Sequence, residues 1–483
     1  MTLSDLLEGI SHRLLQGSKD VQVARIVYDS RQVTPQSLFI ALTGNRVDGH
    51  QYIADAFNRG ASAVIVEHSV ELSGPHTVIE VDDTRMALAK FASRFYGYPA
   101  DDLKLIGITG TNGKTSVSFL VRHLLQQAGH RCGLIGTVEY DLGNCLIPAM
   151  RTTPESPEIH EYLSAMVKEG CNYSVMEVSS HALLQHRVHG LKFDTVAFTN
   201  LTQDHLDYHG SMGNYFKAKR RLFELHAKGG KIVNGDDHYG DQLAQEYAVT
   251  TVGKRESAQL RIEAVELDQS GSRFRIDDTQ FQMPLIGRHN VENAAMAIAI
   301  VQQVAGISLD QSAEGLIKAR TVPGRLEAIE ENQPFGVYVD YAHTDDALSN
   351  VLEALREITP GKLQVVFGCG GNRDAGKREK MGRVASELAD AVTITTDNPR
   401  REDSSSIAQQ IAEGCSSVRQ EGWRIELDRA RAIDEILRSA QLGDTVLVAG
   451  KGHETYQEVN DSVIPFDDSE QIRAILANLG FER

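Results

Sequence analysis

The chain has 483 residues and a formal net charge of −17, with 41% hydrophobic and 24% charged residues. This length is too great for one hydrophobic core and indicates two to four domains, and the acidic balance argues against a nucleic-acid partner. The first residues lack the basic and apolar segments of a secretory signal, no apolar run is long enough to cross a membrane, and the cysteines form no CxxC pair. We therefore expect a globular cytoplasmic protein without disulfides or a zinc site.

Breaks in composition divide the chain into three parts. The first hundred residues mix short strand-like runs with helical stretches and end at Tyr98–Ala100, and further breaks fall at Val322–Arg325 and Asn332–Pro334. Proline and glycine at these points favour turns and linkers over continued helix or strand. We predict α/β domains over residues 1–100, 101–330 and 331–483.

The run Gly107–Ser116 (GITGTNGKTS) follows an apolar strand-like stretch and precedes a segment with apolar residues at helical spacing. A glycine-rich turn between strand and helix presents backbone N–H groups and the positive end of the helix dipole. Lys114 then faces phosphate oxygens, and Thr115 supplies an oxygen for the Mg²⁺ that accompanies ATP. Ile108 stands where the standard phosphate loop has its first glycine, so the strand–turn–helix context supports the interpretation. The alternative is a purely structural turn.

Two later strand-like segments also end in polar residues. Tyr173–Val178 ends in Glu177, at a point where an ATPase places a magnesium ligand or a water-orienting group. The next segment leads to His205, which is either a metal ligand or a solvated surface histidine. Beyond it, the helical pattern makes the basic residues Lys217–Arg221 a solvated face.

In the last third, four strand-like runs each lead into a polar loop, namely residues 340–343, 368–374, 397–400 and 450–454. Alternating strands and helices predict a parallel sheet, whose ligands bind at the carboxyl ends of the strands. Arg187, Arg373 and Arg400 lie in or beside motif loops. Their guanidinium groups suit carboxylate or phosphate ligands, and surface ion pairs are the alternative for each.

Several blocks together resemble the Mur ligase family, the ATP-dependent amino-acid ligases of peptidoglycan precursor synthesis. The blocks, in order along essentially the whole chain, are Thr109–Ser116 (TGTNGKTS), Glu177–Arg187 (EVSSHALLQHR), Thr199–His209 (TNLTQDHLDYH), His289–Ala295 (HNVENAA), Pro323–Arg325 (PGR), Asp340–His343 (DYAH) and Gly450–Glu454 (GKGHE). Tyr28–Arg31 and Asp48–His50 look like the family's uridine-binding region. Asp397–Arg400 (DNPR) resembles the form that adds meso-diaminopimelate rather than lysine.

The resemblance implies a three-domain α/β fold: a small N-terminal UDP-binding domain, a central P-loop ATPase-like domain with a parallel sheet, and a C-terminal Rossmann-like domain. It implies ATP and Mg²⁺ as cofactors, with meso-diaminopimelate ligated to the D-glutamate of UDP-N-acetylmuramoyl-L-Ala-D-Glu through an acyl phosphate. We expect a cytoplasmic monomer without nucleic-acid partners or membrane insertion.

The family's functional residues map onto this sequence as follows. ATP contacts fall on Gly110, Thr111, Asn112, Gly113, Lys114, Thr115, Ser116, Asn293, Arg325, Asp340 and His343. Metal ligands fall on Thr115, Glu177, His205 and a carbamylated Lys219, and the catalytic set is Lys114, Glu177, His205 and Lys219. Contacts to the UDP-linked substrate fall on Tyr28, Ser30, Arg151, Thr152, Thr153, Ser179, Gln185 and Arg187, with a looser match at Asn45, Arg46 and Val47. Amino-acid contacts fall on Arg373, Asp397, Asn398, Pro399, Arg400, Gly450 and Glu454.

Two rival functions differ in their sequence signals. A ligase similar to folylpolyglutamate synthetase shares the phosphate loop, but we expect it to lack Asp397–Arg400 together with Gly450–Glu454. A nucleotide-dependent switch would read guanine through an Asn-Lys-x-Asp run, which this chain does not contain. The complete metal set also argues against an inactive relative.

Overall fold

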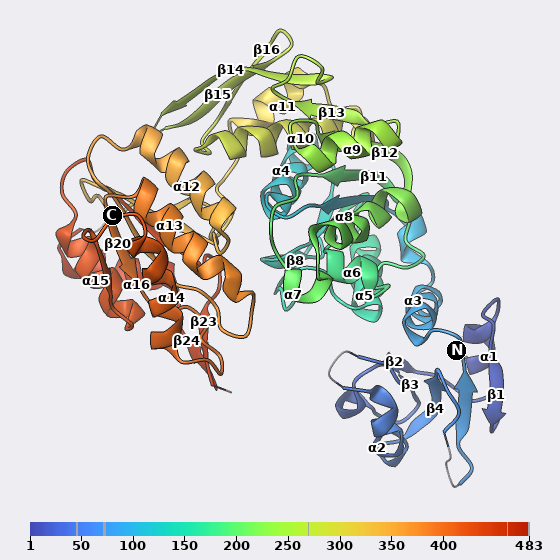
Figure 1. The fold of residues 1–483 in the computed structure, drawn as a ribbon. Coiled ribbons are helices and arrows are strands. Elements are labelled where there is room, and N and C mark those ends of the chain that lie inside the picture. Colours follow the sequence, from blue (N-terminus) through green and yellow to red (C-terminus); the bar gives the residue numbers. More distant parts are fainter. Residues whose placement is uncertain (45–46, 71–73, 269, 461, 482–483) are drawn as a thin grey trace. The chain divides into compact units, whose positions relative to one another are not determined.

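The structure is a computed structural model that describes residues 1–44, 47–70, 74–268, 270–460 and 462–481. Its contacts divide the chain into two compact units, each described by itself below (Figure 1). The first unit comprises Met1–Thr109, Gly129–Val196 and Ala218–Gly230. The second comprises Gly110–Ala128, Ala197–Lys217 and Lys231–Arg483.

The N-terminal part of the first unit is a sheet of five strands in the order β1-β5-β4-β3-β2. The strands are β1 (Arg13–Gln16), β2 (Arg25–Val27), β3 (Ser37–Ile40), β4 (Ala61–Val66) and β5 (Thr77–Glu80), and only β1 is antiparallel to its neighbour. Helices α1 (Leu3–Leu7) and α3 (Thr84–Phe95) pack on one face and α2 (Ile53–Asn58) on the other. The central strands are continuous apolar runs because both of their faces are covered.

The middle of the chain forms one sheet of eleven strands in the order β16-β15-β14-β13-β12-β11-β6-β10-β7-β8-β9. Its strands are β6 (Lys104–Thr109), β7 (Cys132–Ile135), β8 (Glu139–Asp141), β9 (Leu146–Pro148), β10 (Tyr173–Glu177), β11 (Phe193–Phe198), β12 (Ala227–Asn234), β13 (Thr250–Gly253), β14 (Leu260–Asp268), β15 (Gly271–Ile276) and β16 (Thr279–Met283). Strands β6 and β10 are parallel and pair Ile108 with Glu177, so both end at the same edge of the sheet.

Helices precede or connect several of these strands. They are α4 (Lys114–Gln127), α5 (Ser156–Lys168), α6 (Ser180–Leu184), α7 (Leu206–His209), α8 (Met212–Arg221), α9 (His238–Glu246), α10 (Arg288–Ala305) and α11 (Leu309–Leu316). In the first unit α5 packs against α3, and in the second α10 packs against α4. The apolar residues of α4 at Val117, Leu120, Val121 and Leu124 are all buried, as their spacing predicts.

The C-terminal part of the second unit contains a sheet of six strands in the order β17-β18-β22-β19-β20-β21. These are β17 (Glu327–Ala328), β18 (Gly336–Asp340), β19 (Leu363–Phe367), β20 (Ala391–Ile394), β21 (Trp423–Ile425) and β22 (Thr445–Ala449), and only β17 is antiparallel. Helices α12 (Asp345–Ile358), α13 (Arg378–Leu388) and α14 (Ser404–Ser416) cover one face, while α15 (Arg429–Ser439) and α16 (Asp468–Asn478) cover the other (Figure 1). The predicted parallel sheet of this part is confirmed.

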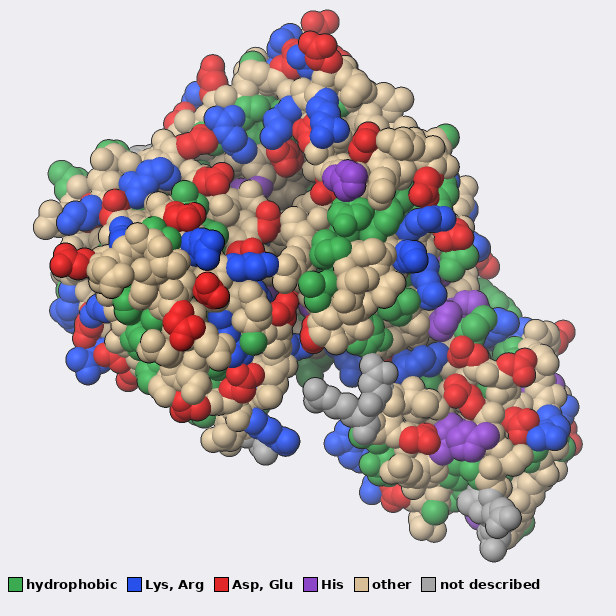
Figure 2. All heavy atoms as spheres, viewed as in Figure 1, with side chains coloured by type: hydrophobic (Ala, Val, Ile, Leu, Met, Phe, Trp, Pro, Cys, Tyr) green, Lys and Arg blue, Asp and Glu red, His purple; other side chains and the backbone are tan. Residues whose placement is uncertain are grey.

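A small hairpin and the surface complete the description. Strands β23 (Tyr456–Val459) and β24 (Ser462–Pro465) pair as a separate antiparallel hairpin. On the face shown in Figure 2, Lys and Arg side chains are interspersed with Asp and Glu. Among the described residues, no helix combines the length and the apolar character that crossing a membrane requires.

Candidate active site

The glycine-rich loop between β6 and α4 has a backbone that only glycine accommodates. Gly110 and Gly113 have φ values of +148° and +82°. A Cβ added to Gly110 would lie 1.9 Å from Thr199 Oγ1, and one added to Gly113 would lie 2.4 Å from Asn293 Oδ1. Gly113 is the N-cap of α4, and no side chain caps this helix. The first N–H groups of a long helix are thus presented in the arrangement that binds phosphate.

The segment after β11 shapes this loop. Thr199 Oγ1 donates a hydrogen bond to Asn112 O at 2.6 Å, and Asn200 Oδ1 accepts one from Asn112 N at 2.9 Å. Thr111 N also donates to Asn200 O at 2.9 Å. Thr199 and Asn200 belong to a block quoted above, but sequence reasoning gave neither a role. The sequence feature that could have identified Thr199 and Asn200 is their position directly after a strand.

Lys114 folds back over the loop that precedes it. Its Nζ donates to the carbonyl oxygens of Gly110 at 3.0 Å and Thr111 at 2.8 Å. These bonds hold the ammonium against the backbone of the glycine-rich loop. The arrangement suits the phosphate oxygens of a nucleotide, because a cation and the N-terminal N–H groups of α4 both belong to this short loop and helix start.

Four other predicted nucleotide contacts lie in the second unit. Arg325 Nη2 lies 3.3 Å from Thr115 Oγ1, and its guanidinium stacks 4.5 Å from the centroid of the Tyr341 ring. Asp340 is buried and accepts hydrogen bonds from the backbone N–H groups of Leu326 and Ala342. Burial raises the pKa of Asp340, and the positive charge of Arg325 lowers it by a smaller amount. Asp340 therefore fixes the backbone around Arg325.

Asn293 is buried, and His343 is partly buried. Burial, with the nearby charge of Lys377, lowers the pKa of His343 to about 4, so its imidazole is neutral at pH 7. Asn293 packs against Gly113, and its Nδ2 lies 3.4 Å from Asn290 Oδ1. Neutral imidazole and amide groups can bind a nucleoside without adding charge.

In the first unit, Glu177 joins a network with predicted substrate-binding residues. Its two carboxylate oxygens accept hydrogen bonds from Thr137 N and Thr137 Oγ1, both at 2.9 Å. Thr137 Oγ1 in turn lies 3.1 Å from Thr152 Oγ1. Thr153 Oγ1 donates to Glu177 O at 2.8 Å and accepts from Ser179 N at 3.1 Å. The structure thus brings Glu177, Thr152, Thr153 and Ser179 together.

Arg187 is held by its neighbours. Its Nη1 donates to Thr153 O and its Nη2 to Gln185 Oε1, both at 2.7 Å. Its Nε lies 3.0 Å from Glu155 Oε1, which also accepts from Arg151 Nη1 at 2.9 Å. Arg187 is therefore in a mostly buried ion pair rather than a surface one. An orienting carboxylate does not prevent a guanidinium from binding substrate, so the expected substrate contact of Arg187 stays a prediction. Sequence reasoning missed Glu155, whose signal was an acidic residue two positions after Thr153.

The predicted uridine-side residues lie around the ends of β2 and β3. Ser30 is buried in a short 3₁₀ turn, and Tyr28 Oη donates to Glu158 Oε1 at 2.8 Å. Of the loosely matched residues, Asn45 and Arg46 lie outside the described residues, and Val47 is exposed.

Asp48, His50 and His68 have ligand atoms within 4.8 Å of one another, as a metal cluster would. However, His50 Nδ1 donates to Asp48 at 2.6 Å, and His50 Nε2 accepts from Glu67 N at 3.1 Å. Both nitrogens of His50 are occupied by protein partners, which leaves no lone pair for a metal. We therefore assign His50 to the structure of its loop.

The loops after β20 and β22 meet in the second unit. Asn398 Nδ2 donates to Glu454 Oε2 at 2.7 Å. A Cβ added to Gly450, whose φ is +106°, would lie 2.7 Å from Asp397 Oδ2, so a side chain at this position would separate the loops. Asp397 and Asn398 are buried.

Two arginines flank Gly370 in the neighbouring loop after β19. A Cβ added to Gly370 would lie 3.0 Å from Arg400 Nη1 and 3.8 Å from Arg373 Cγ. Arg400 has a φ of +53°, and its Nε lies 2.6 Å from Glu458 Oε2. The predicted amino-acid contacts from three different strands are thus neighbours, as expected at the carboxyl edge of a parallel sheet.

Comparison with known proteins places the chain in a family. Three family models match it: "Mur ligase family, catalytic domain" over residues 22–96, "Mur ligase middle domain" over 108–301 and "Mur ligase, glutamate ligase domain" over 324–452. A curated relative from Caldanaerobacter subterraneus, named UDP-N-acetylmuramoyl-L-alanyl-D-glutamate--2,6-diaminopimelate ligase, is 42% identical over 483 residues and covers 99% of each chain. The chain belongs to the Mur ligase family.

Solved structures agree with this Mur ligase assignment. A structure of UDP-N-acetylmuramoyl-L-alanyl-D-glutamate--2,6-diaminopimelate ligase is 30% identical, covers 99% of each chain and has a TM-score of 0.68. MurF ligase from Thermotoga maritima, in complex with ADP, is similar in fold, with 20% identity, a TM-score of 0.65 and coverage of 95% of this chain and 99% of that one.

The structure corrects the pattern-based interpretation of Lys219 in this Mur ligase. The helical pattern made Lys217–Arg221 a solvated face, but only 1% of Lys219 is exposed, whereas Lys217 is exposed. Lys219 is buried because α8 packs through Tyr215, Phe216 and Ala218. Burying an ammonium group costs several kcal/mol unless it is neutralised or paired. The expected carbamylation of Lys219 stays a prediction.

His205, which follows β11, has a strained backbone. Its φ of +53° lies in the left-handed region, and its Nε2 lies 3.4 Å from Asp204 Oδ2. Such strain in a non-glycine residue is often found at functional sites. Thr115 and His205 belong to the second unit, whereas Glu177 and Lys219 belong to the first. The two expected magnesium sites, Thr115 with Glu177 and His205 with Lys219, therefore stay predictions.

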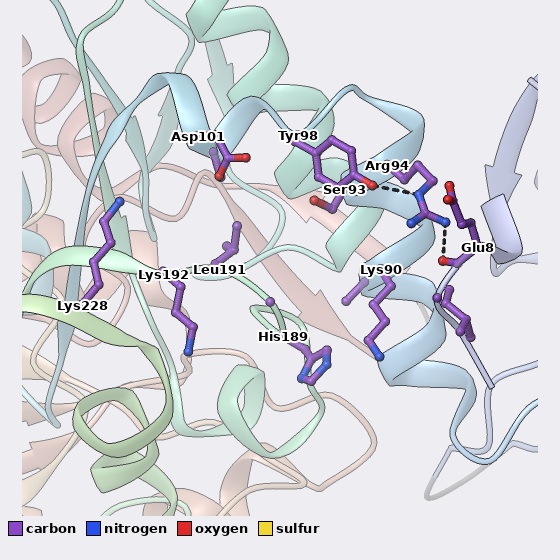
Figure 3. A pocket seen from close by; sticks show the side chains of 15 residues that line it. Glu8, Lys90, Ser93, Arg94, Tyr98, Asp101, His189, Leu191, Lys192 and Lys228 are labelled. Atoms are coloured by element: carbon purple, nitrogen blue, oxygen red, sulfur yellow. Dashed lines mark hydrogen bonds between the residues drawn. The ribbon is translucent and has the colours of Figure 1, made fainter. Parts of the chain in front are cut away.

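One cavity of the Mur ligase contains none of the predicted site residues. It has a volume of about 310 Å³, lies within the first unit and is lined by residues that include Lys90, Arg94, His189 and Lys192 (Figure 3). Arg94 Nη1 donates to the carbonyl oxygens of Asp5, Leu6 and Glu8 at 2.6–3.0 Å. Arg94 therefore caps α1 and attaches it to α3, which gives this wall of the cavity a structural role.

Proposed function

We propose that this protein is the diaminopimelate-adding ligase of peptidoglycan precursor synthesis, UDP-N-acetylmuramoyl-tripeptide synthetase. It joins the D-glutamate side-chain carboxylate of UDP-N-acetylmuramoyl-L-Ala-D-Glu to an amine of meso-diaminopimelate and converts ATP to ADP and phosphate. The main support is the 42% identity, over 99% of each chain, to the curated relative named UDP-N-acetylmuramoyl-L-alanyl-D-glutamate--2,6-diaminopimelate ligase. The meeting of the Asp397–Arg400 and Gly450–Glu454 loops supplies a matching acceptor site.

The reaction proceeds through an acyl phosphate, because a free carboxylate is a poor acyl donor. The γ-phosphoryl group of ATP moves to the D-glutamate carboxylate, and the acceptor amine then attacks the acyl carbon. The tetrahedral intermediate expels phosphate and leaves the amide. Lys114 and the N–H groups at the start of α4 hold the phosphates during transfer, so positioning and electrostatic stabilisation lower the barrier.

Magnesium ions fit the donor groups of this chain. The ions would be held by Thr115, Glu177, His205 and a carbamylated Lys219. Each magnesium ion would supply positive charge to the transferring phosphoryl group. Glu177 is buried with its carboxylate oriented by Thr137. Lys219 is nearly inaccessible, and carbamylation would convert its ammonium into a carboxylate suited to a hard cation.

The remaining residues divide by substrate. Gly110–Ser116, Asn293, Arg325, Asp340 and His343 bind or frame ATP, and Tyr28, Ser30, Arg151–Thr153, Ser179, Gln185 and Arg187 bind the UDP-linked dipeptide. Arg373, Asp397–Arg400, Gly450 and Glu454 bind diaminopimelate. We assign these roles to domains at 1–100, 101–330 and 331–483 of a cytoplasmic monomer without nucleic-acid partners or membrane insertion.

Phosphate release from ATP in the presence of UDP-N-acetylmuramoyl-L-Ala-D-Glu tests this function. We expect meso-diaminopimelate to support release and amide formation, and L-lysine and L-glutamate to support little. Product mass by mass spectrometry would identify the amide. Glutamate as the preferred acceptor would favour a folylpolyglutamate-type ligase, and ATP hydrolysis independent of any acceptor would contradict the proposal.

Replacing Lys219 with alanine is expected nearly to abolish ligase activity while leaving the fold intact, because alanine removes a proposed metal ligand that bicarbonate cannot restore. Activity of the unmodified protein should fall in bicarbonate-free buffer and return when bicarbonate is added, because carbamates form reversibly. Lys217→Ala, on the exposed face of the same helix, is the control. Full activity of Lys219→Ala without bicarbonate would contradict the carbamate assignment.

A further inference from the structure

Lys451 is a fully buried cation in the loop after β22. Its exposed fraction is 0%, and its Nζ lies 3.2 Å from both Asn398 Oδ1 and Glu454 Oε2. Sequence reasoning assigned contacts to Gly450 and Glu454 on either side but none to Lys451. An ammonium group buried so completely is costly unless its partners are well placed. Lys451 lies between two predicted ligand contacts, so we expect its buried charge to have a role at the acceptor site.

The partners of Lys451 also bind each other. Asn398 Nδ2 donates to Glu454 Oε2 at 2.7 Å, the same oxygen that Lys451 contacts. Asn398 Oδ1 accepts a further hydrogen bond from Glu458 N at 2.9 Å. The ammonium, the amide and the carboxylate thus close a triangle that links the loops after β20 and β22.

This triangle fixes the orientation of the Glu454 carboxylate. Lys451 and Asn398 both donate hydrogen bonds to Glu454 Oε2. Among the described residues, Oε1 meets only Tyr341 Oη, at 3.5 Å, the outer limit for a hydrogen bond. With one oxygen held from two sides and the other in only this long contact, Oε1 keeps capacity to accept a further hydrogen bond. An ammonium group of a ligand is a suitable donor for it.

The backbone beneath the triangle is held separately. Arg429 Nη2 donates to Ala449 O at 3.0 Å, and Arg429 Nη1 lies 3.5 Å from Thr396 O. Arg429 Nε and Nη2 also donate to the two carboxylate oxygens of Asp468, both at 2.7 Å, and this ion pair is fully buried. Arg429 thereby joins the ends of β20 and β22. Loss of the Lys451 charge should therefore disturb the side chains of Asn398 and Glu454 more than it disturbs the fold.

We propose that Lys451 is a positioning residue of the acceptor site: it holds Asn398 and Glu454 in the orientation that receives the distal ammonium of diaminopimelate. This inference rests on the proposed function. Lys451 does not contact the reacting atoms; it acts through Glu454, and its effect falls on acceptor binding rather than on phosphoryl transfer.

The charges around Glu454 give this role a pH signature. Burial raises the pKa of Glu454 and the charge of Asp397 raises it further, while Lys451 lowers it. Tyr341, Tyr456 and Arg429 also face the carboxylate electrostatically. Glu454 must be ionised to attract an ammonium group. Without Lys451 its pKa should rise, so acceptor binding should shift to higher pH.

The test is the Lys451→Met variant, which keeps the length of the side chain but not its charge. We expect the KM for meso-diaminopimelate to rise by about tenfold or more, as for a lost charged hydrogen bond, while the KM values for ATP and the UDP-linked substrate stay nearly unchanged. The pH profile of kcat/KM for diaminopimelate should move to higher pH. Lys451→Arg, which keeps the charge, should restore the profile at least in part.

Controls separate this inference from general damage and from the proposed function. Lys362→Met, at an exposed position just before β19, should behave as the unmodified enzyme. If Lys451→Met does not fold by circular dichroism, Lys451→Gln, which keeps a donor without the charge, should show the same pH shift. An unchanged pH profile, or equal rises in all three KM values, would overturn the positioning role. Failure of the unmodified enzyme to use diaminopimelate would overturn the proposed function instead.

Discussion

Replacing Lys114 with alanine is expected to slow ATP-dependent acyl-phosphate formation by about two orders of magnitude or more, roughly 3 kcal/mol of transition-state stabilisation. The ammonium is held against the glycine-rich loop by hydrogen bonds to the carbonyl oxygens of Gly110 and Thr111. A cation placed there before the reaction stabilises charge on the transferring phosphoryl group without reorganisation. Alanine removes this charge and leaves the loop backbone, which Thr199 and Asn200 hold independently.

Rapid-quench measurement of phosphoryl transfer, with the UDP-linked dipeptide present and the acceptor omitted, isolates this step. Lys318→Ala, an exposed lysine beyond α11, serves as the control and should retain the unmodified rate. Unfolding temperatures should match between the two variants, since Lys114 is only half-buried. A loss of only a few-fold would mean that Gly110–Ser116 is not the catalytic phosphate loop.

The elements that sequence predicted well are those with local signals. The phosphate loop was visible because a strand, a glycine-rich turn and a helix follow one another within Leu103–Leu125, and the two glycines have the positive φ values that such a turn requires. The parallel C-terminal sheet was visible because apolar runs alternate with helical patterns. The order of its strands was not, because β22 inserts between β18 and β19 through pairing across a long stretch of chain.

Site residues whose environment depends on tertiary packing were harder to predict. The charges around Lys219 look solvated in sequence, and only the docking of α8 buries that side chain. Glu155 has no motif of its own, yet it orients Arg151 and Arg187. Lys451 lies inside a motif, but its neighbours Asn398 and Glu454 meet only when two distant loops fold together. Contacts between residues far apart in the chain produce no regular spacing in the sequence, so a sequence pattern cannot predict them.

Arg400 is expected to decide which amino acid is accepted. Meso-diaminopimelate carries a distal carboxylate and ammonium, whereas lysine ends in an ammonium alone. Arg400 lies beside Gly370 with its Nη1 donating to Gly371 O at 3.0 Å and its Nε held by Glu458 at 2.6 Å. Its guanidinium is therefore oriented before the ligand binds and can take the distal carboxylate. Lysine would bring a like charge to this group, so discrimination should reach about a thousandfold, roughly 4 kcal/mol.

Steady-state kinetics of Arg400→Ala and Arg400→Lys test this selectivity. Both variants should raise the KM for meso-diaminopimelate far more than the KM for ATP, and lysine at position 400 should not restore it, because an ammonium lacks the planar fork that pairs with a carboxylate. Arg383→Ala, on the exposed face of α13, is the control. Equal use of L-lysine and meso-diaminopimelate by the unmodified enzyme would contradict the assignment of Asp397–Arg400 as the selectivity loop. A selective enzyme whose Arg400 variants remain equally selective would instead transfer that role to Arg373, the other arginine beside Gly370.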